Sequence, residues 1–194
     1  MKNILLINIL FLFVYTSYSQ SDTSIWSDLK TIKKDNYEVS APKNWRELDM
    51  SAYHLQVYFE ASGLAYPLSY NNSPFIVILC IEDLKINSLE DARESVQNGY
   101  SKNTDRVFPE DFKYESESVK LISGEDAYIV NTRFYRKSKG LNQSRFDLVA
   151  YSEKYKTSYM YTISIQYSDP SYEAEKTLGL KDFARKVYSY FKFI

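Results

Sequence analysis

The chain has 194 residues, with 24 lysines and arginines against 25 aspartates and glutamates, and a formal net charge of −1 at pH 7. This length is typical of one globular domain. No run of like charges reaches five residues, which argues against the basic face of a nucleic-acid-binding protein and against a polybasic segment for anionic lipid. We therefore expect no nucleic-acid partner.

The N-terminus has the pattern of a cleaved secretory signal peptide. Lys2 precedes an apolar run over residues 4–15, and small residues stand at Ser17 and Ser19. The run is shorter than the roughly 18–20 apolar residues that span a bilayer, so cleavage is favoured over a membrane anchor. We expect the cut between Ser19 and Gln20, with no stable membrane insertion afterwards. No cysteine follows the run, which argues against a lipid anchor.

The number and position of cysteines support a location in the bacterial cell envelope. Cys80 is the only cysteine, so the chain forms no intramolecular disulfide, and it lies within the apolar run 75–81. This context predicts a buried thiol that behaves as a small hydrophobe and not as a nucleophile. We expect a periplasmic or secreted protein.

The first half of the chain predicts strands followed by one helix. Residues 22–34 read as a polar lead-in in helical register, and residues 36–41 as a short strand. Alternation over 53–59 and the apolar run 75–81 predict two more strands, the second covered on both faces. Ser88 resembles the N-cap of a helix with an apolar stripe.

The second half predicts four antiparallel strands and a closing helix. The strands cover 113–122, 127–135, the region around Phe146, Leu148 and Ala150, and 159–167, with turns at Gly124 and Gly140. Asp169-Pro170 reads as a helix start. An amphipathic helix then carries the apolar residues Leu180, Phe183, Ala184, Val187 and Phe191. We expect a signal peptide over 1–19, a lead-in over 20–35 and one α+β domain over 36–194.

Few residues offer catalytic chemistry. His54 is the only histidine and lies on the polar side of its strand. A catalytic triad would have to use this residue, and a zinc site usually needs several His and Cys ligands, so the sequence favours neither. The spaced glycines form no phosphate-binding loop. We expect no cofactor, no metal and no enzymatic activity. Adjacent carboxylates point apart on a strand, but a hydrolase that uses two carboxylates from different strands stays open as an alternative. The adjacent pairs are Glu82-Asp83, Glu90-Asp91, Glu110-Asp111 and Glu125-Asp126.

One loop resembles a recognition surface. Between the strands at 53–59 and 75–81, Tyr66, Tyr70, Asn71 and Asn72 stand among two leucines. Aromatic and small polar groups on a loop are typical of binding sites. The competing interpretation is that the leucines tuck into the core and the tyrosines only cover apolar surface.

The order of landmarks resembles the PsbP-like superfamily, which includes the photosystem II extrinsic protein, Mog-type proteins and DcrB-type envelope proteins. Four places carry the likeness: Tyr37 to Pro42 followed by Trp45, the strand Phe75 to Ile81 followed by Ser88-Leu89-Glu90, Val119-Lys120-Leu121 leading into Gly124 to Tyr128, and the closing Tyr190-Phe191-Lys192-Phe193. Asn44 and Tyr190 stand where the family usually has glycine and serine.

The resemblance implies an α/β/α sandwich around a mainly antiparallel sheet, with Trp45 in the core, that acts by binding a partner and not by catalysis. It assigns no partner-binding residues. We therefore expect an exported accessory domain that binds an envelope protein or a small ligand. The alternatives are the two-carboxylate envelope hydrolase and a carrier of a small apolar ligand in a tyrosine-lined pocket of roughly 300–1,000 Å³.

Overall fold

The computed structural model describes residues 28–43, 45–49, 55–60, 69–70, 73–109, 114–167 and 180–194. The leader with its expected cleavage site at Ser19 and Gln20, His54, and the helix start at Asp169 lie outside these residues.

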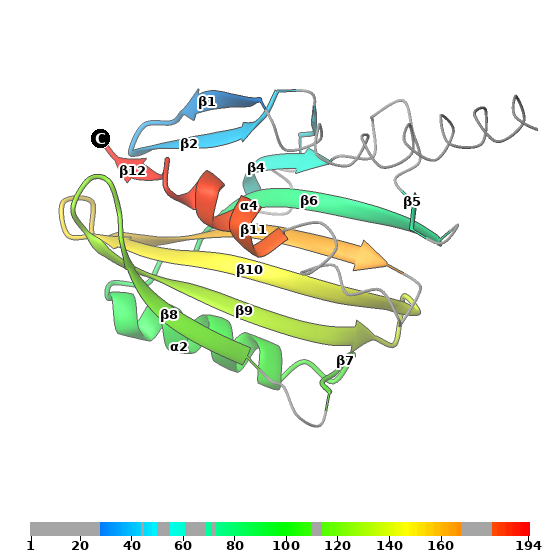
Figure 1. Ribbon diagram of the computed structural model, residues 1–194. Coiled ribbons are helices and arrows are strands. Elements are labelled where there is room, and N and C mark those ends of the chain that lie inside the picture. The colour runs from blue at the N-terminus through cyan, green and yellow to red at the C-terminus, as the bar shows by residue number, and fades with distance from the viewer. Residues whose placement is uncertain are drawn as a thin grey trace, which may run out of the picture.

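A curved antiparallel sheet forms the centre of the molecule (Figure 1). Its strands are β3 (Arg46–Glu47), β4 (Leu55–Glu60), β5 (Ser69–Tyr70), β6 (Ser73–Asp83), β7 (Arg106–Val107), β8 (Tyr114–Lys120), β9 (Asp126–Arg136), β10 (Leu141–Ser152) and β11 (Thr157–Tyr167). They lie in the order β3-β4-β6-β11-β10-β9, with β7 and β8 both paired to the outer edge of β9 and β5 paired to β6. The strand predicted at 75–81 is therefore an interior strand, flanked by β4 and β11.

A smaller sheet joins β1 (Leu29–Lys33), β2 (Tyr37–Pro42) and the C-terminal β12 (Lys192–Phe193). Our reading of residues 22–34 as helical is wrong where the structure describes them. Leu29 to Lys33 pair with β2 in antiparallel register, because a segment this short satisfies its backbone groups better in a sheet than in an isolated helical turn.

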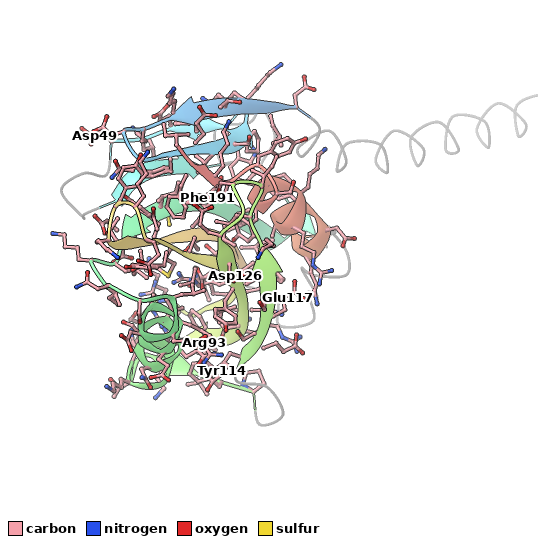
Figure 2. All side chains as sticks on the ribbon, turned by 90° about the vertical axis from the view of Figure 1, so that its left-hand side faces the viewer. Asp49, Arg93, Tyr114, Glu117, Asp126 and Phe191 are labelled. Carbon is pink, nitrogen blue, oxygen red and sulfur yellow. The ribbon has the colours of Figure 1, made fainter. Side chains whose placement is uncertain are left out.

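Two helices cover opposite faces of the central sheet (Figures 1 and 2). α2 (Leu89–Ser101) begins at the expected cap, where the Asp91 amide donates to Ser88 Oγ at 3.1 Å. α4 (Leu180–Tyr188) buries Phe183, Ala184 and Val187. Among the described residues, neither helix is long and apolar enough to cross a membrane.

Alternation along β10 and β11 builds the core under α4. Its buried side chains are Phe146, Leu148, Ala150, Tyr159, Tyr161, Ile163, Ile165 and Tyr167. These are the residues that the period-2 pattern predicts to share the buried side. Trp45 is 3% exposed and its ring lies 6.1 Å from that of Phe183, which confirms it as a core residue.

Tyrosine hydroxyls hold the layers in place. The Tyr188 hydroxyl donates to the Phe146 carbonyl and accepts from the Ile163 amide at 3.2 Å, so α4 is fixed to two strands at once. The Tyr161 hydroxyl donates to the Ser40 carbonyl and thereby joins the small sheet to the large one. The α+β class, with an antiparallel sheet between helices, is confirmed.

Candidate binding cleft

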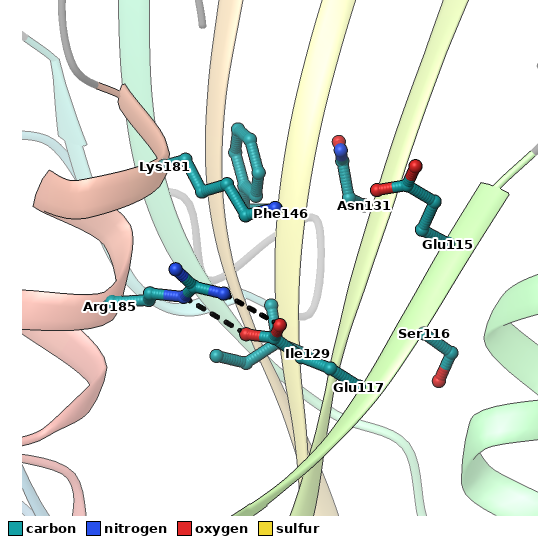
Figure 3. Close-up of a pocket in the computed structure, with 8 residues that line it drawn as sticks. All are labelled: Glu115, Ser116, Glu117, Ile129, Asn131, Phe146, Lys181 and Arg185. Carbon is teal, nitrogen blue, oxygen red and sulfur yellow. Dashed lines mark hydrogen bonds and ion pairs between the residues drawn. The ribbon is translucent and has the colours of Figure 1, made fainter.

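A cavity of about 170 Å³ lies between α4 and the part of the sheet formed by β8, β9 and β10 (Figure 3). Its lining is charged and polar above an apolar floor: Glu115, Ser116, Glu117, Ile129, Asn131, Phe146, Lys181 and Arg185. We call this cavity the α4 cleft.

Strand register and helix period together place the charged groups. Glu115 and Glu117 are two residues apart on β8, where they pair with Asn131 and Ile129 of β9, so all four side chains share the sheet face under α4. Lys181 and Arg185 are four residues apart on α4 and therefore lie on one side of the helix. The cleft thus sets two carboxylates opposite two cations.

One cation and one carboxylate neutralise each other. Arg185 donates from Nε to Glu117 Oε1 at 3.0 Å and from a terminal nitrogen to Glu117 Oε2 at 2.7 Å, which is the two-pronged geometry of a strong arginine–carboxylate pair. Hydrogen bonding to Arg185 lowers the pKa of Glu117, and the same hydrogen bond raises the pKa of Arg185. Glu117 is therefore an ionised carboxylate at neutral pH.

Asn131 is the buried polar residue of the cleft. Its side chain is 6% exposed, and its amide oxygen has no hydrogen-bond partner in the described structure. A buried carbonyl without a donor costs about 1–3 kcal/mol. The neighbouring Phe146 is 1% exposed and faces Asn131 across the β9–β10 pairing, so the amide rises from an apolar floor.

The arrangement is suited to binding. Lys181 is half-buried and Glu115 is exposed, and neither makes a hydrogen bond or salt bridge within the described ranges. Figure 3 shows both side chains reaching into the space above Phe146 and Asn131 from opposite sides. A general acid needs a carboxyl group that holds its proton near neutral pH, which Glu117 does not do while Arg185 engages it.

Most of the residues predicted to form a binding loop lie outside the residues that the structure describes. Tyr66, Asn71 and Asn72 lie outside the described residues, and Tyr70 ends the short strand β5, where it pairs with Ser73. Cys80, which we predicted to be a buried thiol, is partly buried. Desolvation by burial raises the pKa of the thiol to about 11, which keeps it protonated and a weak nucleophile at neutral pH.

The adjacent carboxylate pairs have separate structural contacts where the structure describes them. Asp83 accepts from the Thr157 hydroxyl at 2.9 Å, Glu90 from the Tyr128 hydroxyl at 2.5 Å, and Asp126 from Lys120 at 3.1 Å. Glu110 and Asp111 lie outside the described residues. Among the residues described, no group of three or more His, Cys, Asp and Glu could hold a metal ion.

A second polar cluster lies on the opposite face of the sheet. Arg145 donates to Asp147 at 2.8 Å and to the Thr162 hydroxyl at 3.0 Å, and Thr162 in turn contacts Asp147. Burial raises the pKa of the Asp147 carboxyl to about 8 and lowers the pKa of the Arg145 guanidinium. Arg145 also lines a cavity of about 250 Å³ beside α2, together with Arg106 and Glu82.

The cleft was not among the sequence-based predictions, although two signals for it exist. Glu115 and Glu117 alternate with serines along β8, which places both carboxylates on one face. Asn131 follows Ala127 and Ile129 at two-residue spacing on β9, so a polar residue shares one face of the strand with two apolar ones. Neither signal predicts that Lys181 and Arg185 line the cleft, because only the docking of α4 on the sheet brings these residues next to β8 and β9.

Comparison with known proteins identifies the fold. No protein-family model and no curated protein sequence matches the chain. The Ran-binding protein Mog1p of Saccharomyces cerevisiae matches at a TM-score of 0.50 and 11% identity, over 85% of this chain and 95% of that one. LpqN, involved in cell envelope biogenesis of Mycobacterium tuberculosis, matches at 0.48 and 13% identity, over 86% and 90%. The likeness to Mog1p shows the fold alone: the chain has the PsbP-like α+β architecture that its sequence landmarks predict.

Proposed function

We propose that the protein is an exported, non-catalytic binding domain of the PsbP-like superfamily, which takes a small ligand, or one group of an envelope partner, into the α4 cleft. The observation that carries this proposal is the set of polar groups in the cleft: Lys181, Glu115 and the Asn131 oxygen have no hydrogen bond or salt bridge within the described part of the chain. A few placed polar groups above an apolar floor are typical of ligand sites.

The charges of the cleft favour binding over hydrolysis. Glu115 and Glu117 are the nearest counterpart of a hydrolase's carboxylate pair, since they share one face of β8. Glycoside hydrolases need one of the two carboxyls protonated as the acid. Arg185 lowers the pKa of Glu117, which removes that residue from the acid role. The two-carboxylate hydrolase is therefore the second candidate.

The same cleft argues against a carrier of apolar molecules. Its volume of about 170 Å³ is below the roughly 300 Å³ of an ordinary small-molecule pocket, and four of its eight lining residues are charged. A small polar molecule fits this chemistry better.

Export rests on the N-terminal pattern. The apolar run over residues 4–15, followed by Ser17 and Ser19, supports delivery to the periplasm or the outside of a bacterial cell. Expression of the complete chain in a bacterium tests this directly. We expect intact mass spectrometry of the periplasmic fraction to find residues 20–194, and a variant lacking residues 4–15 to stay in the cytoplasm.

Retention of envelope metabolites tests the binding role. Protein purified from the periplasm is incubated with a small-molecule extract of the envelope and examined by native mass spectrometry. We expect the wild type to retain a stoichiometric added mass and the double variant Glu115→Gln/Lys181→Met to lose it. The matched control is Glu94→Gln/Lys186→Met, which makes the same charge changes at exposed helix positions away from the cleft lining.

Two results would contradict the proposal. Equal retention by the wild type and the cleft double variant would place binding elsewhere on the molecule. Release of cell-wall fragments by the wild type, abolished by Glu115→Gln alone and not by Glu94→Gln, would support the hydrolase instead.

A further inference from the structure

The α4 cleft holds two opposite charges that form no hydrogen bond or salt bridge within the described residues. Glu117 and Arg185 form a closed pair at 2.7 and 3.0 Å. Lys181 and Glu115 have no such contact anywhere in the described structure, although both line the same cavity. An ammonium and a carboxylate on one small site form a template for a ligand that carries the complementary pair.

Asn131 adds a directional contact between these charges. Its buried oxygen accepts no hydrogen bond within the described ranges, so it can accept one from a donor group of a bound ligand. A primary ammonium has three donor hydrogens and no acceptor. One such group can therefore satisfy both the Glu115 carboxylate and the Asn131 oxygen, which face each other as paired residues of β8 and β9.

The size of the cleft limits the ligand. A volume of about 170 Å³ is close to that of an engineered cavity of about 150 Å³ that admits benzene. This space suits one short skeleton with its charged groups at the open side and its apolar part on Phe146 and Ile129.

We propose that the α4 cleft binds a small zwitterion of the α-amino acid class, with the ligand carboxylate on Lys181 and the ligand ammonium on Glu115 and Asn131. This assignment rests on the proposed binding function of the cleft and names the ligand class. The pair Glu117–Arg185 is already neutral and acts as a fixed wall that ties β8 to α4.

Three probes of similar size test the assignment in the wild-type protein purified from the periplasm. L-alanine carries both charges, propionate only the carboxylate, and ethylammonium only the ammonium. Calorimetric titration at one ionic strength should show L-alanine binding at least about tenfold more tightly than either single-charge probe, a difference of about 1.4 kcal/mol. Equal affinities for the three probes would overturn the proposal.

Single substitutions identify the residues involved. Glu115→Gln and Lys181→Met should each weaken L-alanine binding about tenfold, whereas the matched controls Glu94→Gln and Lys186→Met should leave it unchanged. Asn131→Leu should abolish binding without lowering the urea midpoint, since it removes an unpaired buried oxygen. A purely structural Asn131 would show the reverse, with a lower midpoint and unchanged binding.

The outcomes separate this inference from the broader function. If no amino-acid probe binds, yet the cleft double variant loses the mass retained from the envelope extract, the zwitterion assignment is wrong and the binding function stands. If neither the probes nor the extract binds at the cleft, both fail. L-alanine binding that persists unchanged in Glu115→Gln and Lys181→Met would place the amino acid elsewhere and overturn the inference.

Discussion

The two faces of the central sheet are built from the same strands but by different interactions. On the face under α4, β10 and β11 present the apolar residues Phe146, Leu148, Ala150, Tyr161, Ile163 and Ile165. On the face under α2, the alternate positions of these strands are mainly polar and still buried: Asp147, Ser158, Thr162 and Ser164. The α4 face of these strands is therefore held by apolar packing, whereas the α2 face combines a smaller apolar cluster around Val130, Phe134 and Val149 with buried polar groups and the Arg145–Asp147 contact.

This difference predicts that the two faces of the sheet tolerate different kinds of substitution. Asp147 and Leu148 are neighbours on β10, point to opposite faces, and are both 0% exposed. A buried apolar residue is stabilised in proportion to the area it removes from water. A buried ionisable group is stable only while its partners remain, because the ion pair and the hydrogen bonds around it together offset its desolvation. Substitutions at these two adjacent positions should therefore lower the stability of the fold for different physical reasons.

The largest effect is expected from Asp147→Ala. The change removes the buried Asp147 carboxyl, which accepts from Arg145 at 2.8 Å and from the Thr162 hydroxyl, so that both donors lose a buried acceptor. Breaking such a pair costs about 3–5 kcal/mol. Urea unfolding followed by tryptophan fluorescence measures the loss.

The control replaces both members of the pair. Arg145→Met/Asp147→Leu should recover most of the lost stability, since apolar residues of similar volume remove the need for pairing. A double variant no more stable than Asp147→Ala would show that the α2 face needs the polar groups themselves.

Leu148→Ala should cost somewhat less, about 2–5 kcal/mol, through lost burial and the cavity left behind. Circular dichroism during urea unfolding gives the value. Leu148→Met is the matched control and should stay within about 1.5 kcal/mol of the wild type, because it conserves volume. A loss below about 1 kcal/mol for Leu148→Ala would contradict apolar packing as the main stabilisation of the α4 face.

The smallest effect concerns the ion pair at the rim of the α4 face. Because the pKa of Glu117 is lowered in the folded protein, its contribution is present above the unfolded value near 4.5 and is lost as pH falls through the folded value. With the Glu117 and Arg185 side chains 39% and 46% exposed, that contribution should stay below about 1 kcal/mol.

The difference in unfolding free energy between the wild type and Glu117→Gln should therefore be largest near pH 7 and should approach zero toward pH 3. The same difference should shrink in 1 M salt, where exposed charges are screened. A difference that stays constant from pH 7 to pH 3 would mean that the carboxylate charge contributes nothing.

Much of the fold could be predicted because many of its strands, turns and caps follow patterns formed by residues close together in the sequence. The period-2 series on β11 and the Ser88 cap of α2 both appear where the sequence places them. Gly124 and Gly140 occupy the expected turns with φ of 99° and 63°, a region that glycine adopts freely. The segment Leu29 to Lys33 differed because five residues with a mixed apolar pattern take the structure of the neighbour they pair with, which no local signal specifies.

The α4 cleft was harder to foresee than the fold. Its carboxylates and Asn131 come from neighbouring strands, but its cations Lys181 and Arg185 come from a helix much further along the chain, with Arg185 68 residues beyond Glu117. The loop around Tyr66 and Tyr70, whose composition is typical of a recognition surface but also fits core-edge packing, remains a separate prediction.

By itself, the sequence determined the strand and helix periods and the side of β10 and β11 that packs against α4, since each follows from the spacing of residues close in the chain; the export leader stays a prediction. Only the tertiary structure decided that the polar side of those strands is buried as well, that Arg145 finds Asp147 there, and that Lys181 faces Glu115 across the cleft. Periodicity states which residues share a face. What covers that face, and which charges it brings together, depends on the docking of elements distant in sequence.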